Sequence, residues 1–269
     1  MFIQDGFLSE EYEAPLTALR KNNIGWFELV NVCNRLAMDI LSHIKPPIED
    51  NQKLLSAGFY GRAVQSFQAI ILLIARGMTS DARTVLRSMA ETVIIHRKIA
   101  KDHSFIDRLT ERHQYHRRKF ANALLRDEQA GSALHPEQFV KLRNVIQEID
   151  AEYPDTKPKD IRLEQVAIDV DGISIYNLII RPTSGDAAHV NLDALMRHMV
   201  TDSAGNISGL RFGPDLSDLA DTLSLTVSVL LNTLDTVVED FQLETFCDRL
   251  TACLTTWKTL TEATNSPAS

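Results

Sequence analysis

The strongest constraint on the fold is a pair of long amphipathic segments joined by a very short connection. Residues 52–76 carry apolar side chains at three- and four-residue steps, the spacing that puts them on one face of a helix. Gly77 follows where a helix commonly ends, and Thr79 or Ser80 can cap the next helix, 80–101. A connection this short returns the second helix antiparallel to the first, so that their apolar faces cover each other. The sequence therefore predicts an antiparallel helical hairpin.

The same spacing predicts helices along most of the remaining chain. The first is a long helix over residues 12–44, bent near Gly25 and ended by a Pro-Pro pair. Further helices are expected at residues 104–130, 135–152, 161–168, 172–181, 215–240 and 242–262. Residues 197–212 differ, because two short extended stretches flank an Ala-Gly-Asn turn, a pattern typical of a β-hairpin. We therefore expect an all-α protein, a single domain over residues 1–269 that forms an antiparallel multi-helix bundle with a small β-hairpin insert near 197–212.

The overall charge argues against a general affinity for duplex nucleic acid. The chain has 28 Lys and Arg against 36 Asp and Glu, a formal net charge of −8 at pH 7. Such affinity comes mainly from Lys and Arg residues that neutralise phosphates. The stretch from Arg108 to Lys119 is the exception, since it is dominated by polar and basic residues. Local binding of RNA by this basic stretch therefore stays an open alternative.

The sequence predicts a cytoplasmic protein without a membrane partner. The N-terminus has neither the basic region nor the long apolar region of a signal peptide. The longest apolar run, residues 69–75, is far shorter than the ~20 residues of a membrane span. The three cysteines, Cys33, Cys247 and Cys253, lack C-x-x-C spacing, which fits a reducing compartment. We expect them to be small packing residues.

Known catalytic and metal-binding patterns give no assignment. The sequence contains no phosphate-binding Gly-rich loop, zinc-protease motif or hydrolase motif. His113 and His116 share a helix face near Glu111, but neighbouring cations would repel a metal ion. We therefore expect no metal and no cofactor. Arg108 and His113 do match the loose Arg-x4-His spacing of HEPN ribonucleases.

A charge pair on the second hairpin helix is the first candidate site. Arg87 and Glu91 are one helical turn apart, so their side chains can meet. In a cleft between helices, the arginine would keep the carboxylate ionised, and the pair could orient a catalytic group. The alternative is an exposed ion pair that contributes roughly a few tenths of a kcal/mol. Ile94 and Ile95 flank the pair, which is unusual for an exposed face, so both interpretations stay open.

A second candidate site lies in residues 176–189, where reactive side chains gather at the end of a predicted helix. Arg181 could clamp a phosphate or a carboxylate with its planar guanidinium group. His189 is a candidate general acid or base, because histidine ordinarily titrates near neutral pH. Ser184 could be a nucleophile only beside such a base, and we treat Tyr176 and Ser184 as candidate binding residues. Alternatively, Ser184 caps a turn, and Arg181 and His189 make local contacts.

Together these two segments resemble DUF5677, an uncharacterised helical family of bacteria. The family pattern is an Arg-Ser-x-x-Glu helix followed by a Tyr, Arg, Ser and His segment, which this chain matches with Arg87, Ser88, Glu91, Tyr176, Arg181, Ser184 and His189. The resemblance covers about residues 50–240, with one departure, an extra Gly185-Asp186 turn before His189. It implies one shared polar site in which Arg87 and Glu91 face Arg181 and His189, but it supplies no reaction.

Three functions fit these residues. The first is a metal-independent nuclease resembling HEPN proteins, of bacterial defence or toxin type, with four catalytic residues: Arg87, Glu91, Arg181 and His189. Arg181 would stabilise phosphate charge and His189 would move protons. The second is a non-catalytic sensor of a small anionic ligand, and the third is a structural or interaction protein. The expected partner is thus RNA or a small phosphate-containing ligand, and long helices with several apolar stripes would also suit a homodimer.

Overall fold

The computed structural model describes residues 5–9, 13–127, 135–183, 192–216 and 218–265, which are mostly helical. The chain divides into two compact units, residues 1–101 with 167–269 and residues 102–166. The first unit holds a helical bundle and a small two-stranded sheet, and the second holds a pair of helices. The predicted all-α class with a β-hairpin insert is therefore confirmed.

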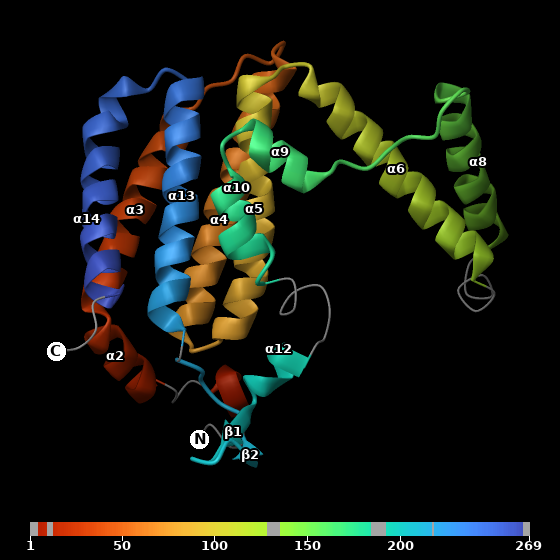
Figure 1. The fold of residues 1–269 in the computed structure, drawn as a ribbon. Coiled ribbons are helices and arrows are strands. Elements are labelled where there is room, and N and C mark those ends of the chain that lie inside the picture. The colour runs from red at the N-terminus through yellow and green to blue at the C-terminus, as the bar shows by residue number, and fades with distance from the viewer. Residues whose placement is uncertain (1–4, 10–12, 128–134, 184–191, 217, 266–269) are drawn as a thin grey trace. The chain divides into compact units, whose positions relative to one another are not determined.

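The bundle of the first unit consists of long helices that pack along their apolar faces (Figure 1). These are α3 (Ile24–His43), α4 (Asn51–Ala75), α5 (Thr79–Lys101), α13 (Leu219–Asp240) and α14 (Cys247–Asn265). α13 packs against α4 and α5, and α14 packs against α13 and α3. Fully buried side chains such as Leu36, Phe67, Met89 and Leu230 fill the interior. Their burial stabilises helices that would be marginal in water on their own.

The turn between α4 and α5 is as tight as the sequence predicts. Gly77 has a φ of +73°, and the N–H groups of Gly77 and Met78 return to the carbonyls of Ile74 and Leu73, the double bond pattern of a glycine-ended helix. A Cβ added to Gly77 would stand 2.4 Å from Pro214 Cβ. The position therefore requires glycine for both its backbone conformation and its space, and the predicted hairpin is confirmed.

α4 is the one helix within the described residues that is long and apolar enough to cross a membrane by length and composition. Core helices of soluble proteins can have the same composition. One stripe of α4 is buried in the bundle, and it includes Tyr60, Val64, Phe67, Ile70 and Ile74. Core packing thus accounts for the most apolar face of this helix.

The predicted N-terminal helix over residues 12–44 is interrupted in the structure. α2 (Glu13–Asn22) ends at Asn23, whose side-chain amide donates to the carbonyl of Leu19 at 3.0 Å, and α3 begins at the next residue. Gly25 lies just after this break and against α14, since a Cβ added to it would stand 3.1 Å from Leu260 Cδ2. The break therefore falls at Asn23, while Gly25 allows α3 and α14 to approach closely.

The remaining elements are short. They are η1 (Gly6–Leu8), α9 (Leu163–Asp169), which runs across the boundary between the two units in the sequence, α10 (Ile173–Ile175), the π-helix η2 (Tyr176–Ile180), α12 (Leu192–Met196), β1 (Met199–Thr201), β2 (Ile207–Leu210) and η3 (Glu244–Phe246). The two strands pair antiparallel, with Val200 opposite Gly209. Their turn has Gly205 at a φ of +84°, and the Asp202 carboxylate accepts the backbone N–H of Asn206 at 2.9 Å. The hairpin predicted around this turn is confirmed.

The second unit is built from α6 (Phe105–Arg126) and α8 (Pro136–Glu152), which pack against each other. Pro136 occupies the first turn of α8, where a missing N–H costs nothing. Polar contacts join the two helices: Arg118 Nε donates to Asp150 at 2.8 Å, and Gln114 donates to Glu152 at 2.9 Å. The unit therefore depends more on polar contacts than the bundle does.

Candidate functional site

The structure brings Arg87 and Glu91 together and connects them to the π-helix η2. Arg87 Nη2 lies 3.2 Å from Glu91 Oε1, an ion pair between adjacent turns of α5. Arg87 Nη1 also donates to the carbonyl oxygen of Ile180 at 2.8 Å. The Arg87 side chain is 20% exposed and the Glu91 side chain 34%, so water partly screens the pair. Arg87 therefore ties α5 to the last residue of η2.

The π-helix determines where Arg181 lies. In a π-helix each N–H reaches the carbonyl five residues earlier, and Arg181 N donates to Tyr176 O at 3.0 Å. The Arg181 guanidinium lies over the Tyr176 ring, 5.4 Å from its centroid, in a cation–π arrangement. Arg181 is exposed, whereas Ile179 and Ile180 are buried. Single π turns of this kind are frequent at functional sites.

We call the four residues Arg87, Glu91, Tyr176 and Arg181 the α5–η2 site. The contact of Arg87 with the backbone of Ile180 brings the two predicted segments together, although they are about ninety residues apart. Ser184 and His189 lie outside the described residues, so their predicted places in the site stay predictions. Just before them, Thr183 is buried, and its hydroxyl donates to the carbonyl of Ile179 at 2.5 Å.

The basic stretch of α6 is largely neutralised by acidic side chains of its own unit. Three of its four arginines form ion pairs, which are Arg108 with Glu111, Arg112 with Asp160 at 3.3 Å and Arg118 with Asp150 at 2.8 Å. His116 Nε2 also lies 3.5 Å from an Asp160 oxygen. An RNA phosphate would have to compete with these carboxylates for the arginines. The stretch is therefore a weaker phosphate-binding surface than its composition predicts.

A comparison with known protein families identifies the family of this chain. The model of a family of unknown function, DUF5677, matches residues 53–207, more than half of the chain. The chain belongs to the DUF5677 family. No curated protein and no solved structure matches it. The resemblance seen in the sequence is thus confirmed, and all four residues of the α5–η2 site lie inside the DUF5677 match, whereas α13 and α14 lie outside it.

The structure also contains a buried polar cluster that the sequence analysis missed. It joins Lys53 and Ser56 of α4, His96 of α5 and Asp240 at the end of α13. The Ser56 hydroxyl donates to Asp240 Oδ2 at 2.6 Å and lies 3.0 Å from His96 Nε2. Lys53 Nζ lies 2.5 Å from Asp240 Oδ1. Ser56 and His96 have no exposed surface. We call these four residues the core cluster; the first three belong to the DUF5677 match, and Asp240 does not.

The core cluster resembles a serine-histidine-aspartate set in composition but not in proton arrangement. Ser56 has one hydroxyl proton and gives it to Asp240, so His96 must present a protonated Nε2 to Ser56. A catalytic histidine would instead accept the serine proton. Burial lowers the pKa of His96 to about 4, against an opposing effect of the Asp240 charge. His96 Nδ1 has no hydrogen-bond partner among the described residues. The cluster therefore has a structural role.

One sequence signal could have pointed to the core cluster. Ser56 lies on the same helical stripe of α4 as Tyr60, Ala63 and Phe67, all of which are buried. A small polar residue on a buried stripe requires a partner, because an unpaired buried hydroxyl costs free energy. Its partners come from two other helices, and the helical spacing of a single sequence does not identify them.

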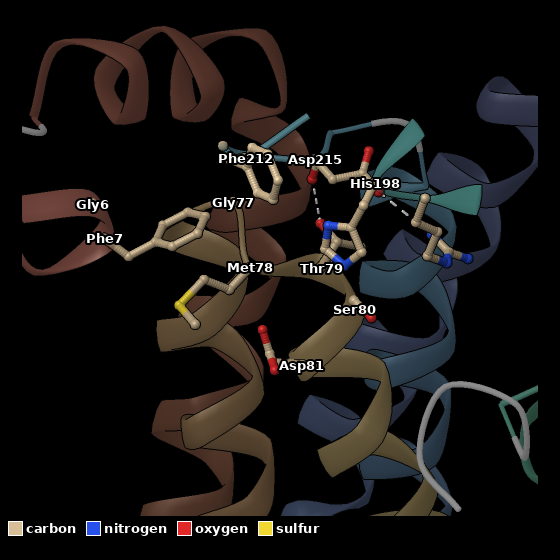
Figure 2. Close-up of a pocket in the computed structure, with 12 residues that line it drawn as sticks. Gly6, Phe7, Gly77, Met78, Thr79, Ser80, Asp81, His198, Phe212 and Asp215 are labelled. Carbon is tan, nitrogen blue, oxygen red and sulfur yellow. Dashed lines mark hydrogen bonds and ion pairs between the residues drawn. The ribbon is translucent and has the colours of Figure 1, made fainter. Parts of the chain in front are cut away.

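A pocket of about 550 Å³ opens beside the α4–α5 turn (Figure 2). Its apolar wall includes Phe7, Met78 and Phe212. Arg197 lies at this pocket too, but it is held by Asp218 at 2.6 Å and by Asp215 at 3.5 Å, so its charge is compensated. Of the predicted site residues that the structure describes, none lines this pocket. Arg87 and Glu91 lie farther along α5, and Tyr176 and Arg181 lie at η2.

Proposed function

We propose that this DUF5677 protein binds a small phosphate-containing ligand at the α5–η2 site, with Arg181 as the anion-binding group. The observation that carries the proposal is the exposed Arg181 guanidinium, held over the Tyr176 ring at the end of the π-helix. Stacking on an aromatic ring fixes the plane of an arginine guanidinium group, whose N–H donors match the geometry of a phosphate or a carboxylate. Tyr176 would therefore hold the donor edge in place before the ligand arrives.

Arg87 has a different role in the proposal, because its guanidinium already has two partners. The Glu91 carboxylate pairs with Nη2 of Arg87, and the carbonyl oxygen of Ile180 accepts a hydrogen bond from Nη1. Arg87 would thus hold the backbone of Ile180, the residue just before Arg181, and so help to position Arg181. Glu91 balances the Arg87 charge, and Arg181 brings a second guanidinium group to the site. A single cation of this kind suits one phosphate group better than a long polyanion.

Two observations favour a small ligand over RNA. The chain has a formal net charge of −8 at pH 7, and three of the four arginines of the basic α6 stretch are paired with carboxylates. RNA affinity depends on several cations acting on successive phosphates. A small ligand requires only the local donors of the α5–η2 site.

The test is a melting-temperature screen with inorganic phosphate, pyrophosphate and nucleoside mono- and triphosphates. At a hundredfold excess over Kd, a ligand that binds only the folded state should raise the melting temperature by roughly 5 °C or more. Arg181→Gln should abolish the shift while melting close to wild type without ligand, since Arg181 is exposed. Arg35→Gln, an exposed arginine on α3, is the matched control and should keep the shift. The proposal is wrong if none of these compounds shifts the wild type.

A catalytic outcome would be seen in a separate assay. Purified protein is incubated with end-labelled RNA in EDTA, and the wild type is compared with His189→Ala. Cleavage that disappears in the variant would replace the binding proposal with a metal-independent ribonuclease, in which Arg181 stabilises phosphate charge and His189 moves protons. Intact RNA in both samples, together with a ligand-dependent melting shift, is the result we expect.

A further inference from the structure

Two cysteines far apart in the sequence meet between α3 and α14. Cys33 of α3 and Cys253 of α14 are both buried on the faces along which these two helices pack. Gly25 faces Leu260, and one pocket is lined by Leu29 together with Cys253, so the helices run antiparallel and the next turn of the α3 stripe places Cys33 opposite Cys253. Close packing at Gly25 keeps the two backbones near each other. The third cysteine, Cys247, is exposed at the start of α14.

We propose that Cys33 and Cys253 form a redox-responsive pair that closes to a disulfide between α3 and α14 when the protein meets a peroxide. In a reducing compartment the pair would stay as two thiols, so the sequence expectation of packing residues describes its reduced state. The disulfide would be a transient modification, unlike the permanent frameworks of secreted proteins. It is independent of the α5–η2 site and of any ligand bound there.

Cys253 is the nucleophile of the pair. A hydrogen bond from Cys33 lowers the pKa of Cys253, the Arg249 charge lowers it further, and burial opposes both effects. The same contact and burial raise the pKa of Cys33, which therefore keeps its proton and acts as the donor. Arg249 is one helical turn before Cys253, with Nη1 2.8 Å from Asp39 of α3. A thiolate stabilised in this way is the form that reacts with peroxides.

A pocket lined in part by Cys253 brings a small oxidant next to this residue. The pocket has a volume of about 440 Å³, and its lining includes Cys253, Glu28, Val32 and Thr256. Glu28 and Val32 are exposed, so the pocket reaches the protein surface. A peroxide molecule fits this volume easily, although the Cys253 side chain itself is almost fully covered.

The reaction balances in two steps. The Cys253 thiolate attacks one oxygen of hydrogen peroxide, an S–O bond forms as the O–O bond breaks, and the released hydroxide is protonated to water. Cys33 sulfur then attacks Cys253 sulfur, the S–S bond forms as the S–O bond breaks, and the Cys33 proton leaves with the second hydroxide as water. Two thiols are oxidised, and one peroxide is reduced to two waters.

The experiment maps the disulfide in the full-length native protein. The protein is treated with hydrogen peroxide, denatured in N-ethylmaleimide to block free thiols, and digested with trypsin. Cleavage after Arg249 separates Cys253, in peptide 250–258, from Cys247, and Cys33 falls in peptide 22–35. We expect the 22–35 and 250–258 peptides to become cross-linked with a loss of two hydrogens. The cross-linked protein should melt roughly 5 °C or more above the reduced protein.

Three variants sharpen the test. Cys247→Ser should form the same cross-link, because Cys247 is exposed and takes no part. Cys33→Ser should leave Cys253 oxidised without the cross-link. Arg249→Gln should slow the reaction several-fold, since less Cys253 is ionised, and its products are mapped by intact mass. If wild-type Cys33 and Cys253 are both still alkylated after Cys247 has been oxidised, the proposal is overturned, and this result requires no variant to fold.

Discussion

Helix α5 carries two polar groups of residues that differ in their contact with water. The Arg87–Glu91 pair of the α5–η2 site is half-buried, with 20% and 34% of its side chains exposed. His96 of the core cluster, farther along the same helix, has no exposed surface. Water can replace a lost partner at the first group but not at the second. The same type of substitution should therefore have very different effects at the two places.

The comparison also separates two uses of polar residues in a helical bundle. The core cluster joins α4, α5 and α13 through the contacts of Ser56 with His96 and Asp240 and of Lys53 with Asp240. The α5–η2 site uses a half-buried arginine to fix a π turn that presents Arg181 at the surface. Ser56 and His96 of the core cluster are thus enclosed between helices, whereas the α5–η2 site has Arg181 exposed at the surface.

The largest effect is expected for Asp240→Ala. The substitution removes the acceptor of Ser56 and the counter-ion of Lys53, which leaves a partly buried ammonium group without its carboxylate. We expect a loss of about 3 kcal/mol in the free energy of unfolding, measured by urea denaturation at pH 7.5. Asp240→Asn keeps a hydrogen-bond acceptor and should lose less. A loss below about 1 kcal/mol for the alanine variant would show that the cluster is not a structural centre.

Acid should weaken the protein through His96. Burial lowers the folded-state pKa of His96 from 6.5 to about 4, so the unfolded chain takes up a proton first as the pH falls. The contribution of His96 is fully present above pH 6.5 and is lost progressively towards pH 4, by roughly 3 kcal/mol in total. Urea denaturation at several pH values measures this loss. His96→Asn should flatten the curve in that window, and an unchanged curve in the variant would assign the acid loss to other groups.

The smallest effects are expected at the α5–η2 site. Arg87→Ala leaves the buried carbonyl of Ile180 and the half-buried carboxylate of Glu91 without their donor, and water reaches the Glu91 carboxylate, so we expect a loss of about 1 to 2 kcal/mol. Glu91→Ala removes only the ion pair and should cost less than about 1 kcal/mol. Urea denaturation measures both variants. Equal and large losses would mean that this site is as structural as the core cluster.

Much of the fold could be predicted because its determinants are local. Gly77 alone places the α4–α5 turn, since its positive φ and the carbonyls of the last turn of α4 are properties of adjacent residues. The turn around Gly205 and Asp202 is local in the same way. The break at Asn23 was predicted only as a bend near Gly25 within one continuous helix, because the apolar spacing continues across it. Periodicity reports which face is buried, but it does not report a short interruption of the backbone.

The candidate site was predictable only in part. The spacing of Arg87 and Glu91 already places both on one face of α5, as the ion pair shows. The bond from Arg87 to the Ile180 carbonyl, by contrast, joins segments far apart in the sequence, and the acceptor is a backbone atom that no side-chain pattern reveals. The core cluster and the Cys33–Cys253 contact were missed for the same reason. Their members are polar or small residues brought together by three-dimensional packing alone.

The second unit begins and ends at neighbouring points of the bundle. Lys101 is the last residue of the first unit before the chain enters the second, and its Nζ lies 3.7 Å from Oδ2 of Asp171. Lys98 Nζ lies 3.6 Å from Oδ2 of Asp169. The chain thus departs from the bundle and returns to it at one place. Such an arrangement lets a whole segment be gained, lost or exchanged in evolution without a change in the connections between the helices of the bundle. Residues 102–166 have the topology of a domain inserted into the bundle. A short linker in their place would still connect the two parts of the chain that form the bundle.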